Sequence, residues 1–149
     1  KFEAFKIDSL ELKTSPILDF LSYNGNIPND KWTLEVQVRQ PLYFVKESAY
    51  VSGLDIILTV FEKPTEDDQP VDLIKIKAGI AGLFKVENNR FLEDNEKKIV
   101  LIHFPALLFP YLRSAITGLV ASGGLGTFIF PLINIHSLIE DKINNVDIQ

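Results

Sequence analysis

Few residues in this 149-residue chain have the types and spacing that chemistry requires. The only two histidines, His103 and His136, lie among apolar residues, and neither has a nearby acid to fix its tautomer as in a catalytic triad. The chain has no cysteine, so it has neither a thiolate metal site nor a disulfide framework. We therefore expect no catalytic centre, no metal and no other cofactor, and we do not expect an enzyme.

Two further patterns approach ligand-binding motifs without meeting their requirements. The cluster Gly123-Gly124-Leu125-Gly126 is not followed by the Lys and Ser or Thr of a phosphate-binding loop, and it ends a predicted helix instead of starting one. The acidic run Glu66-Asp67-Asp68 lacks the alternating ligand spacing of a calcium loop. We interpret the first as a helix stop with a hinge and the second as a solvated turn.

Length and charge narrow the classes of partner. A chain of 149 residues is long enough to bury a core, and we expect one domain over residues 1–149. The net charge of −5 and the absence of a Lys/Arg-rich block argue against a nucleic-acid partner. The first residue is Lys1 and not Met, which indicates that the native start is missing. Nothing in the remaining sequence argues for export, so we expect the protein in the cytoplasm.

The most apolar part of the chain runs from Phe104 to Leu138. We expect a helix whose first turn contains Pro110 and which stops at Gly123-Gly124. Arg113, the prolines and this glycine stop argue against a membrane-spanning helix. Apolar residues at helical spacing form one broad stripe: Leu107, Leu108, Tyr111, Leu112, Ala115, Ile116, Leu119 and Val120.

So broad an apolar stripe leaves the helix a thin polar face. A helix that is apolar around most of its circumference needs cover from two sides, which a single small sheet does not provide. We therefore expect the helix to lie at a subunit interface of a homo-oligomer. The expected interface residues are Leu108, Tyr111, Leu112, Ala115, Ile116 and Leu119.

The sequence before this helix alternates between apolar and polar residues, as antiparallel strands do. We expect four strands, with a slip near Ser9 in the first, and a short second helix after the long one. The fold class is therefore α+β: a four-stranded antiparallel sheet followed by one long and one short helix. The expected strands are residues 2–12, 32–40, 50–62 and 71–87, and the short helix is residues 135–143.

An excess of large apolar residues falls outside regular elements or at their ends. If these side chains converge, they line a hydrophobic groove that binds extended polypeptide. The alternative interpretation is that they only close the protein's own core. The residues predicted to bind polypeptide are Phe20, Tyr23, Trp32, Phe128, Phe130, Ile135, Leu138 and Ile139.

Several of these segments resemble the SecB family of bacterial protein-export chaperones. The family's opening motif is present as Leu108-Phe109-Pro110-Tyr111, followed by Arg113 and the Gly123-Gly124 stop. The apolar loop ends in Pro131-Leu132-Ile133-Asn134-Ile135, and Trp32 stands near the start of the second strand as in the family. The resemblance implies a Greek-key sheet backed by a long and a short helix, assembled as a homotetrameric dimer of dimers. It also implies an ATP-independent holdase that binds non-native polypeptides in protein export.

One departure from the family concerns its docking to the motor ATPase SecA. The resemblance places acidic docking residues near the end of the first strand and on the fourth strand, where this chain has Thr14, Leu18 and Lys77. Lys75 and Lys77 reverse the expected charge, which puts SecA docking in doubt. Two other functions stay open. One is a SecB-like chaperone dedicated to a single client, such as the antitoxin of a toxin–antitoxin system. The other is a carrier of a small apolar ligand or lipid.

Overall fold

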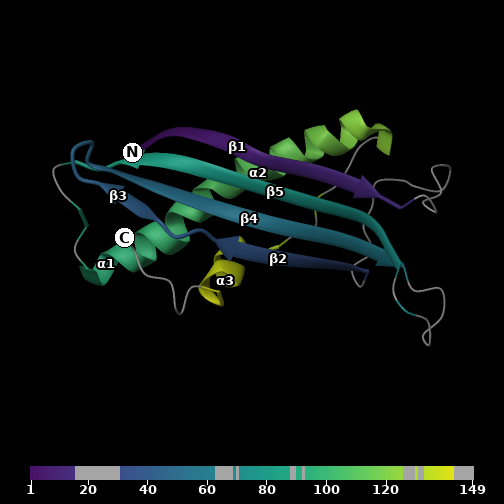
Figure 1. Cartoon of the computed structure of the whole chain (residues 1–149). Helices are drawn as coiled ribbons and strands as arrows, with labels where there is room; N and C mark the ends of the chain where they lie inside the picture. The colour runs from purple at the N-terminus through teal and green to yellow at the C-terminus, as the bar shows by residue number, and fades with distance from the viewer. Residues whose placement is uncertain are drawn as a thin grey trace.

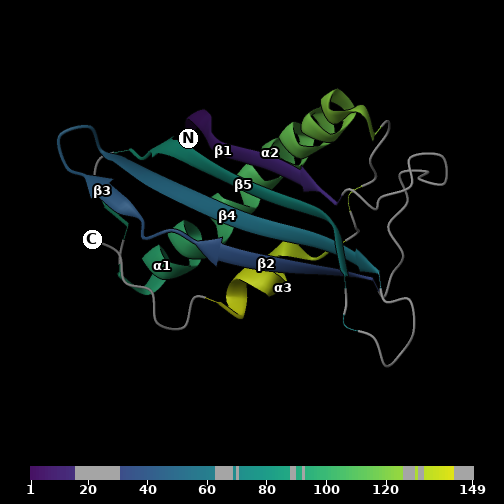
Figure 2. The ribbon, with the colours of Figure 1, turned by 45° about the vertical axis from the view of Figure 1, so that its right-hand side comes forward.

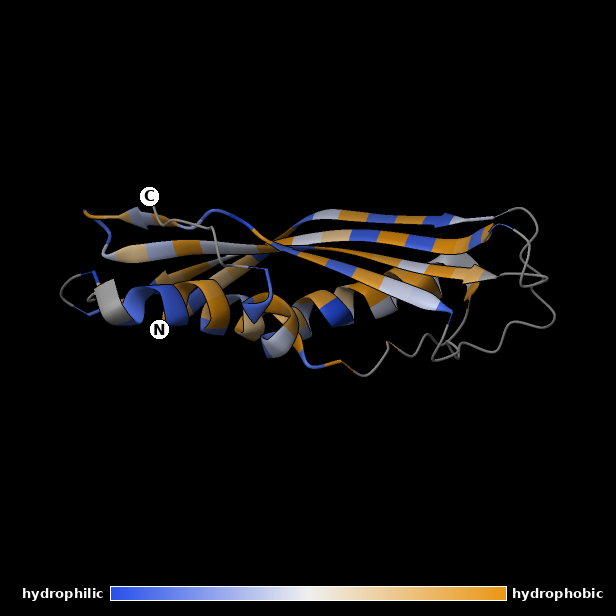
Figure 3. Ribbon diagram, turned by 90° about the horizontal axis from the view of Figure 1, so that it is seen from below, coloured by the Kyte–Doolittle hydropathy of each residue, from blue (hydrophilic) through white to orange (hydrophobic). Residues whose placement is uncertain are grey.

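The structure is a computed structural model, and it describes residues 1–15, 31–62, 69, 71–87, 90, 91, 93–125, 130 and 133–142. An antiparallel sheet forms one layer, and the helices lie on one of its faces (Figures 1 and 3). The strand order β1-β5-β4-β2 places the first strand beside the last, as in a Greek key. The strands are β1 (Phe2–Thr14), β2 (Trp32–Val38), β3 (Leu42–Phe44), β4 (Ala49–Glu62) and β5 (Val71–Lys85).

The predicted fold class is confirmed, with one short strand more than expected. Pro41 follows β2, and the chain then pairs again with β4 through the three residues of β3. The pairing of β1 with β5 shifts its register between Ile7 and Ser9, which confirms the predicted slip. One face of the sheet carries the core, because alternate residues such as Ile74, Ile76 and Ile80 are almost fully buried beneath the helices.

The long helical segment starts earlier than the sequence predicted. It begins at α1 (Glu93–Lys98), continues through a π-helical turn η1 (Ile99–His103) into α2 (Phe104–Val120), and ends in η2 (Ala121–Leu125). The prediction that Pro110 lies in the first turn is therefore wrong, because Pro110 lies inside α2. The π turn precedes Pro105, and in it the backbone N–H of Phe104 donates to the carbonyl of Ile99. Gly124 has φ of 85° and ends the segment as predicted.

The prolines, which the sequence analysis took as evidence against a membrane-spanning helix, do not interrupt this helix. Residues Asn95–Leu125 form one helix that is long and apolar enough, by length and composition alone, to cross a membrane. The core helix of a globular domain passes the same criterion, and this one crosses the sheet diagonally with one side packed on it (Figure 1). We interpret it as a core helix.

The predicted apolar stripe divides into two rows on α2. Leu108, Leu112 and Ile116 are fully buried against the sheet of the same chain, so these three predicted interface residues belong to the core of the protomer. Gly82 on β5 lets Leu108 approach, because a Cβ there would meet the Leu108 Cδ2 atom. The neighbouring row stays accessible: Leu107 is 53% and Tyr111 is 42% exposed.

The short helix α3 (Ile135–Glu140) lies beside β2 at the edge of the sheet (Figure 2). The Asn134 side chain caps it, with its Oδ1 atom accepting the backbone N–H of Ser137 at 3.3 Å. Ile139 is fully buried and anchors the helix in the core. The helix ends at Glu140, with Asp141 as its C-cap, so the predicted end at residue 143 is wrong.

Candidate functional site

A hollow of about 510 Å³ lies between β2 and α3. We call it the β2–α3 groove. Apolar side chains dominate its lining, and none of the lining side chains carries a charge. Its lining residues are Trp32, Thr33, Leu34, Ile133, Asn134, Ser137 and Leu138.

The local sequence explains how these residues meet. The alternation along β2 places Trp32, Leu34, Val36 and Val38 on the helix-covered face of the sheet. Val36 and Val38 are buried under the helices, whereas Trp32 and Leu34 are only half-buried. Because Ile139 anchors α3 in the core, the preceding residue Leu138 lies at the groove.

The structure places the eight predicted polypeptide-binding residues in different environments. Trp32 and Leu138 line the groove. Ile135 and Phe130 are half-buried against the core, with the Phe130 ring 5.6 Å from that of Phe109. Ile139 is fully buried and does not face the groove. The other three predicted residues, Phe20, Tyr23 and Phe128, lie outside the described residues.

Two apolar residues of the groove were missed, Leu34 and Ile133. The β2 alternation offered a signal for Leu34, because a residue two positions after Trp32 shares its face. Ile133 lies within the motif Pro131-Leu132-Ile133-Asn134-Ile135, but this short loop has no periodicity that could indicate which of the motif's side chains points to β2. The polar groups at the groove, on Thr33, Asn134 and Ser137, gave no sequence signal of a site.

The backbone of β2 is the second feature of this edge. β2 is the end strand of the sheet and pairs only with β4 among the described strands. The bonds Phe61 N–H to Lys31 O and Arg39 N–H to Gly53 O, both 3.0 Å, fix the phase of the ladder. In an antiparallel ladder, alternate residues bond to the partner strand. The odd-numbered residues of β2 therefore bond to β4, and the N–H and C=O groups of Trp32, Leu34 and Val36 point to the free edge.

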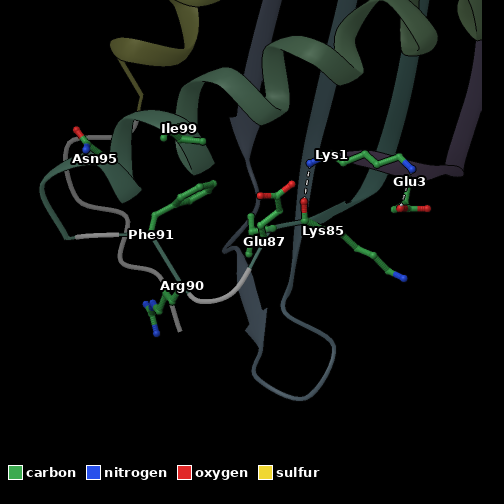
Figure 4. A pocket seen from close by; sticks show the side chains of 9 residues that line it. Lys1, Glu3, Lys85, Glu87, Arg90, Phe91, Asn95 and Ile99 are labelled. Carbon is green, nitrogen blue, oxygen red and sulfur yellow. Dashed lines mark hydrogen bonds and ion pairs between the residues drawn. The ribbon is translucent and has the colours of Figure 1, made fainter.

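A second hollow, of about 810 Å³, lies at the other end of the sheet (Figure 4). Charged residues from three segments line it, including Lys1, Lys85 and Arg90, with Phe91 beside them (Figure 4). Because charged groups surround its apolar floor, this hollow suits an apolar polypeptide segment less well than the β2–α3 groove does.

A buried hydrogen-bond network lies beside this second hollow and joins Tyr50 of β4 to Glu96 of α1. Glu96 is 6% exposed; its carboxylate accepts from the Tyr50 hydroxyl at 2.6 Å and from Arg90 at 2.5 and 2.8 Å. The Tyr50 hydroxyl accepts the backbone N–H of Phe91 at 3.1 Å. The hydrogen bonds from Arg90 hold the pKa of the Glu96 carboxyl below its usual value, and burial raises the pKa of Tyr50. Because Tyr50 and Glu96 are buried, we interpret these contacts as stabilising the fold and not as part of a binding site.

The face of the sheet opposite the helices carries an ion-pair cluster. The Arg39 guanidinium lies between two carboxylates, bonding Asp8 at 2.6 and 2.7 Å and Asp55 at 2.8 and 2.7 Å. These bonds lower the pKa of Asp8 and raise the pKa of Arg39. Gly53 and Gly79 leave room for it, because a Cβ on either would meet the Arg39 side chain. The cluster thus joins β1, β4 and the end of β2 across the sheet.

The two histidines lie close together but form no recognisable catalytic site. The His103 and His136 rings lie edge to face with 5.6 Å between centroids, and both residues are exposed. Within the described part of the chain, no group of three His, Cys, Asp or Glu residues could hold a metal ion.

Comparison with known proteins decides the family. The model described as "Preprotein translocase subunit SecB" matches residues 20–146 of the chain. The chain belongs to the SecB family. The "Protein-export protein SecB" of Halorhodospira halophila is 29% identical over 118 residues, which cover 76% of this chain and 62% of that protein. The protein of the same description from Alcanivorax borkumensis is 30% identical over 91 residues, which cover 60% of this chain and 54% of that protein.

A solved structure agrees with the SecB fold. The SecB-like chaperone of Mycobacterium tuberculosis, in complex with a ChAD peptide from the HigA1 antitoxin, superposes with a TM-score of 0.58 at 12% identity. The match covers 89% of this chain and 90% of that chain. The resemblance drawn from the sequence is thereby confirmed for family and fold. The chain spans about three fifths of the length of the SecB relatives it matches first.

Proposed function

We propose that this SecB-family protein is an ATP-independent holdase that binds non-native polypeptides in the β2–α3 groove. The observation that carries the proposal is the coincidence of an uncharged apolar hollow with a strand edge whose alternate backbone groups point outward. Folded proteins bury both kinds of surface, whereas an unfolded chain offers apolar side chains and unpaired backbone together. The proposal needs no cofactor, and we place it in the cytoplasm.

Capture follows from the geometry of the edge. An extended client segment that bonds to the N–H and C=O groups of Trp32, Leu34 and Val36 would pair with β2 without regard to its sequence. Its alternate side chains would point to the helix side of the sheet, where the groove lies. Each buried aliphatic side chain contributes about 1.5–3 kcal/mol, so one groove binds weakly and reversibly. Weak binding suits a protein that must release its client unchanged.

We propose further that the protein works as a homo-oligomer, a dimer of dimers. The exposed row of α2 supports this, because Leu107 and Tyr111 leave apolar surface uncovered. Phe5 of β1 extends that surface: it is 45% exposed and its ring centroid lies 4.5 Å from that of Tyr111. The interface residues proposed now are Tyr111, Ala115 and Leu119, with Leu107 and Phe5 added. Several grooves on one particle would raise affinity through effective concentration.

The polypeptide class is favoured over a small apolar ligand. A lipid head group needs fixed polar or charged partners, and the groove lining offers no charged side chain. Among polypeptide clients, export substrates are suggested by the names of the relatives. A dedicated client is the second candidate, because Lys75 and Lys77 stand on β5 where SecA docking would need acidic residues. The Mycobacterium tuberculosis relative in fold binds a peptide from an antitoxin.

The test is suppression of aggregation of a chemically unfolded model protein. The wild-type protein should suppress aggregation without ATP, and Leu138→Glu should require at least about tenfold more protein, because a charge in the groove must be desolvated when the client binds. Val45→Glu is the matched control, since Val45 is 76% exposed and lies outside the groove. Equal loss in both variants, or a lipid found by mass spectrometry with no suppression by the wild type, would reject the holdase.

A further inference from the structure

We propose that the helix-free face of the sheet is a docking surface for an acidic protein segment that carries apolar residues between its acids. We call this surface the outer face; it is the face that no described helix covers (Figure 3). On β5 it carries Lys75 and Lys77, which alternate with the buried residues Ile74, Ile76 and Ala78. The inference concerns a different surface from the β2–α3 groove and does not depend on the proposed holdase.

The charge of the outer face has the opposite sign to that of the chain. The chain carries a net charge of −5. The face carries the carboxylates Asp8 and Asp55, which share the Arg39 guanidinium, and Glu11 and Glu35. Together with Arg39, the lysines that the register places on the same face outnumber these four carboxylates: Lys6, Lys13, Lys75, Lys77 and Lys85.

The two outer-face lysines in the middle of β5 have different neighbours on β1. Lys75 and Lys77 form no ion pair with any residue that the structure describes. Glu11 of β1 lies directly opposite Lys77 in the ladder, and Lys13, which pairs with Glu11 at 3.3 Å, lies directly opposite Lys75. Opposite charges in directly opposed positions stabilise a sheet and like charges destabilise it, so the repulsion is confined to Lys13 and Lys75. Lys75 is therefore the lysine whose surroundings in the isolated chain are least favourable. An acidic partner would remove this repulsion, because its carboxylates would lie between the ammonium groups.

Apolar side chains between the lysines define the partner further. Ile57 lies beside Lys77 in the register, and Val51 lies beside Leu83 and Leu42 in a second row. The first three of these apolar residues are partly exposed, and Leu42 is 41% exposed. A mixed basic and aliphatic surface fits a polypeptide in which acidic and aliphatic residues alternate. Nucleic acid fits less well, since it has no aliphatic groups to cover and the net charge of the protein repels it.

The test uses a synthetic 16-residue peptide in which glutamate alternates with leucine and valine, and measures its affinity by fluorescence anisotropy. The Leu138→Glu protein is used throughout, so that binding in the β2–α3 groove does not contribute. Lys75→Glu/Lys77→Glu should weaken binding at least about tenfold at low salt, and added salt should weaken binding to the unsubstituted face. Lys97→Glu/Lys98→Glu, which changes the same charge on the exposed side of α1, should change affinity less than about twofold.

If circular dichroism shows that Lys75→Glu/Lys77→Glu does not fold, Lys75→Gln/Lys77→Gln replaces it. This neutral variant should lose less affinity for the peptide than the charge-reversed variant would. A peptide with glutamine in place of glutamate should not bind. The inference is overturned if the two double glutamate variants lose affinity equally, or if the glutamine peptide binds as well as the glutamate peptide. It is also overturned if a 16-base-pair DNA duplex binds to the same lysines as tightly, because the surface would then recognise any polyanion. None of these outcomes bears on suppression of aggregation.

Discussion

Replacing Glu96 by glutamine should destabilise the protein without affecting polypeptide binding. The carboxylate is 6% exposed and accepts two hydrogen bonds from Arg90 and one from Tyr50. Bonds to a charged group contribute about 1.5–3 kcal/mol each, but the Arg90 side chain is 43% exposed, so water screens the pair. Glutamine keeps an acceptor for Tyr50 and loses the charge. We therefore expect a loss of about 1–2 kcal/mol in the free energy of unfolding at pH 7.

The pH dependence gives this prediction its sign. The pKa of Glu96 in the folded protein is lowered from its usual value of 4.5, so its contribution is present above that value and is lost as the pH falls through the folded-state pKa. Urea unfolding, at fixed protein concentration, should thus show a difference between wild type and Glu96→Gln at pH 7 that shrinks as the pH falls below 4.5. Glu35→Gln, at an exposed glutamate of β2, is the control. A difference independent of pH, or no difference at pH 7, would refute the reasoning.

Three further predictions concern the sheet and α2. Gly79→Ala should destabilise the protein by about 1–3 kcal/mol in thermal unfolding, because its Cβ would meet the Arg39 guanidinium and the Asp55 carboxylate. Gly118→Ala, inside α2, should stabilise the protein by about 0.5–1 kcal/mol, because its Cβ would meet nothing within 4 Å. Leu107→Asp should reduce the oligomer to smaller species in sedimentation velocity, whereas Phe44→Asp, which is 43% exposed on β3, should not; an unchanged mass for Leu107→Asp would remove the proposed interface.

The sequence predicted the parts of the fold that periodicity encodes. The four long strands of the sheet, the slip near Ser9 and the stop at Gly124 all follow from local alternation or backbone preference, and the structure confirms them. The short strand β3 was not predicted. The start of the long helix was missed because proline normally marks a first turn. Here the π turn at Ile99–His103 comes directly before α2, and α2 contains both Pro105 and Pro110. Such a turn depends on packing against the sheet, which no short window of sequence contains.

The groove was predicted in part, for a related reason. Trp32 and Leu138 were assigned because they are large and apolar near the ends of elements, and both line the hollow. Ile139 is a similar large apolar residue, but it is fully buried in the core. Residue type alone does not distinguish two neighbours on a one-and-a-half-turn helix. The contact between α3 and β2, distant in sequence, makes that distinction.

The two rows on α2 connect the fold to the proposed function. Leu108, Leu112, Ile116 and Val120 are fully buried, so a protomer can complete its core without a partner. A single groove that accepts one or two client side chains offers about 1.5–6 kcal/mol, which corresponds to a dissociation constant no lower than roughly tens of micromolar. A holdase must bind far more tightly than that to prevent aggregation. In the proposed oligomer, the exposed row beginning at Leu107 would supply what the groove lacks, because it would join several grooves on one particle that a single long client could occupy together.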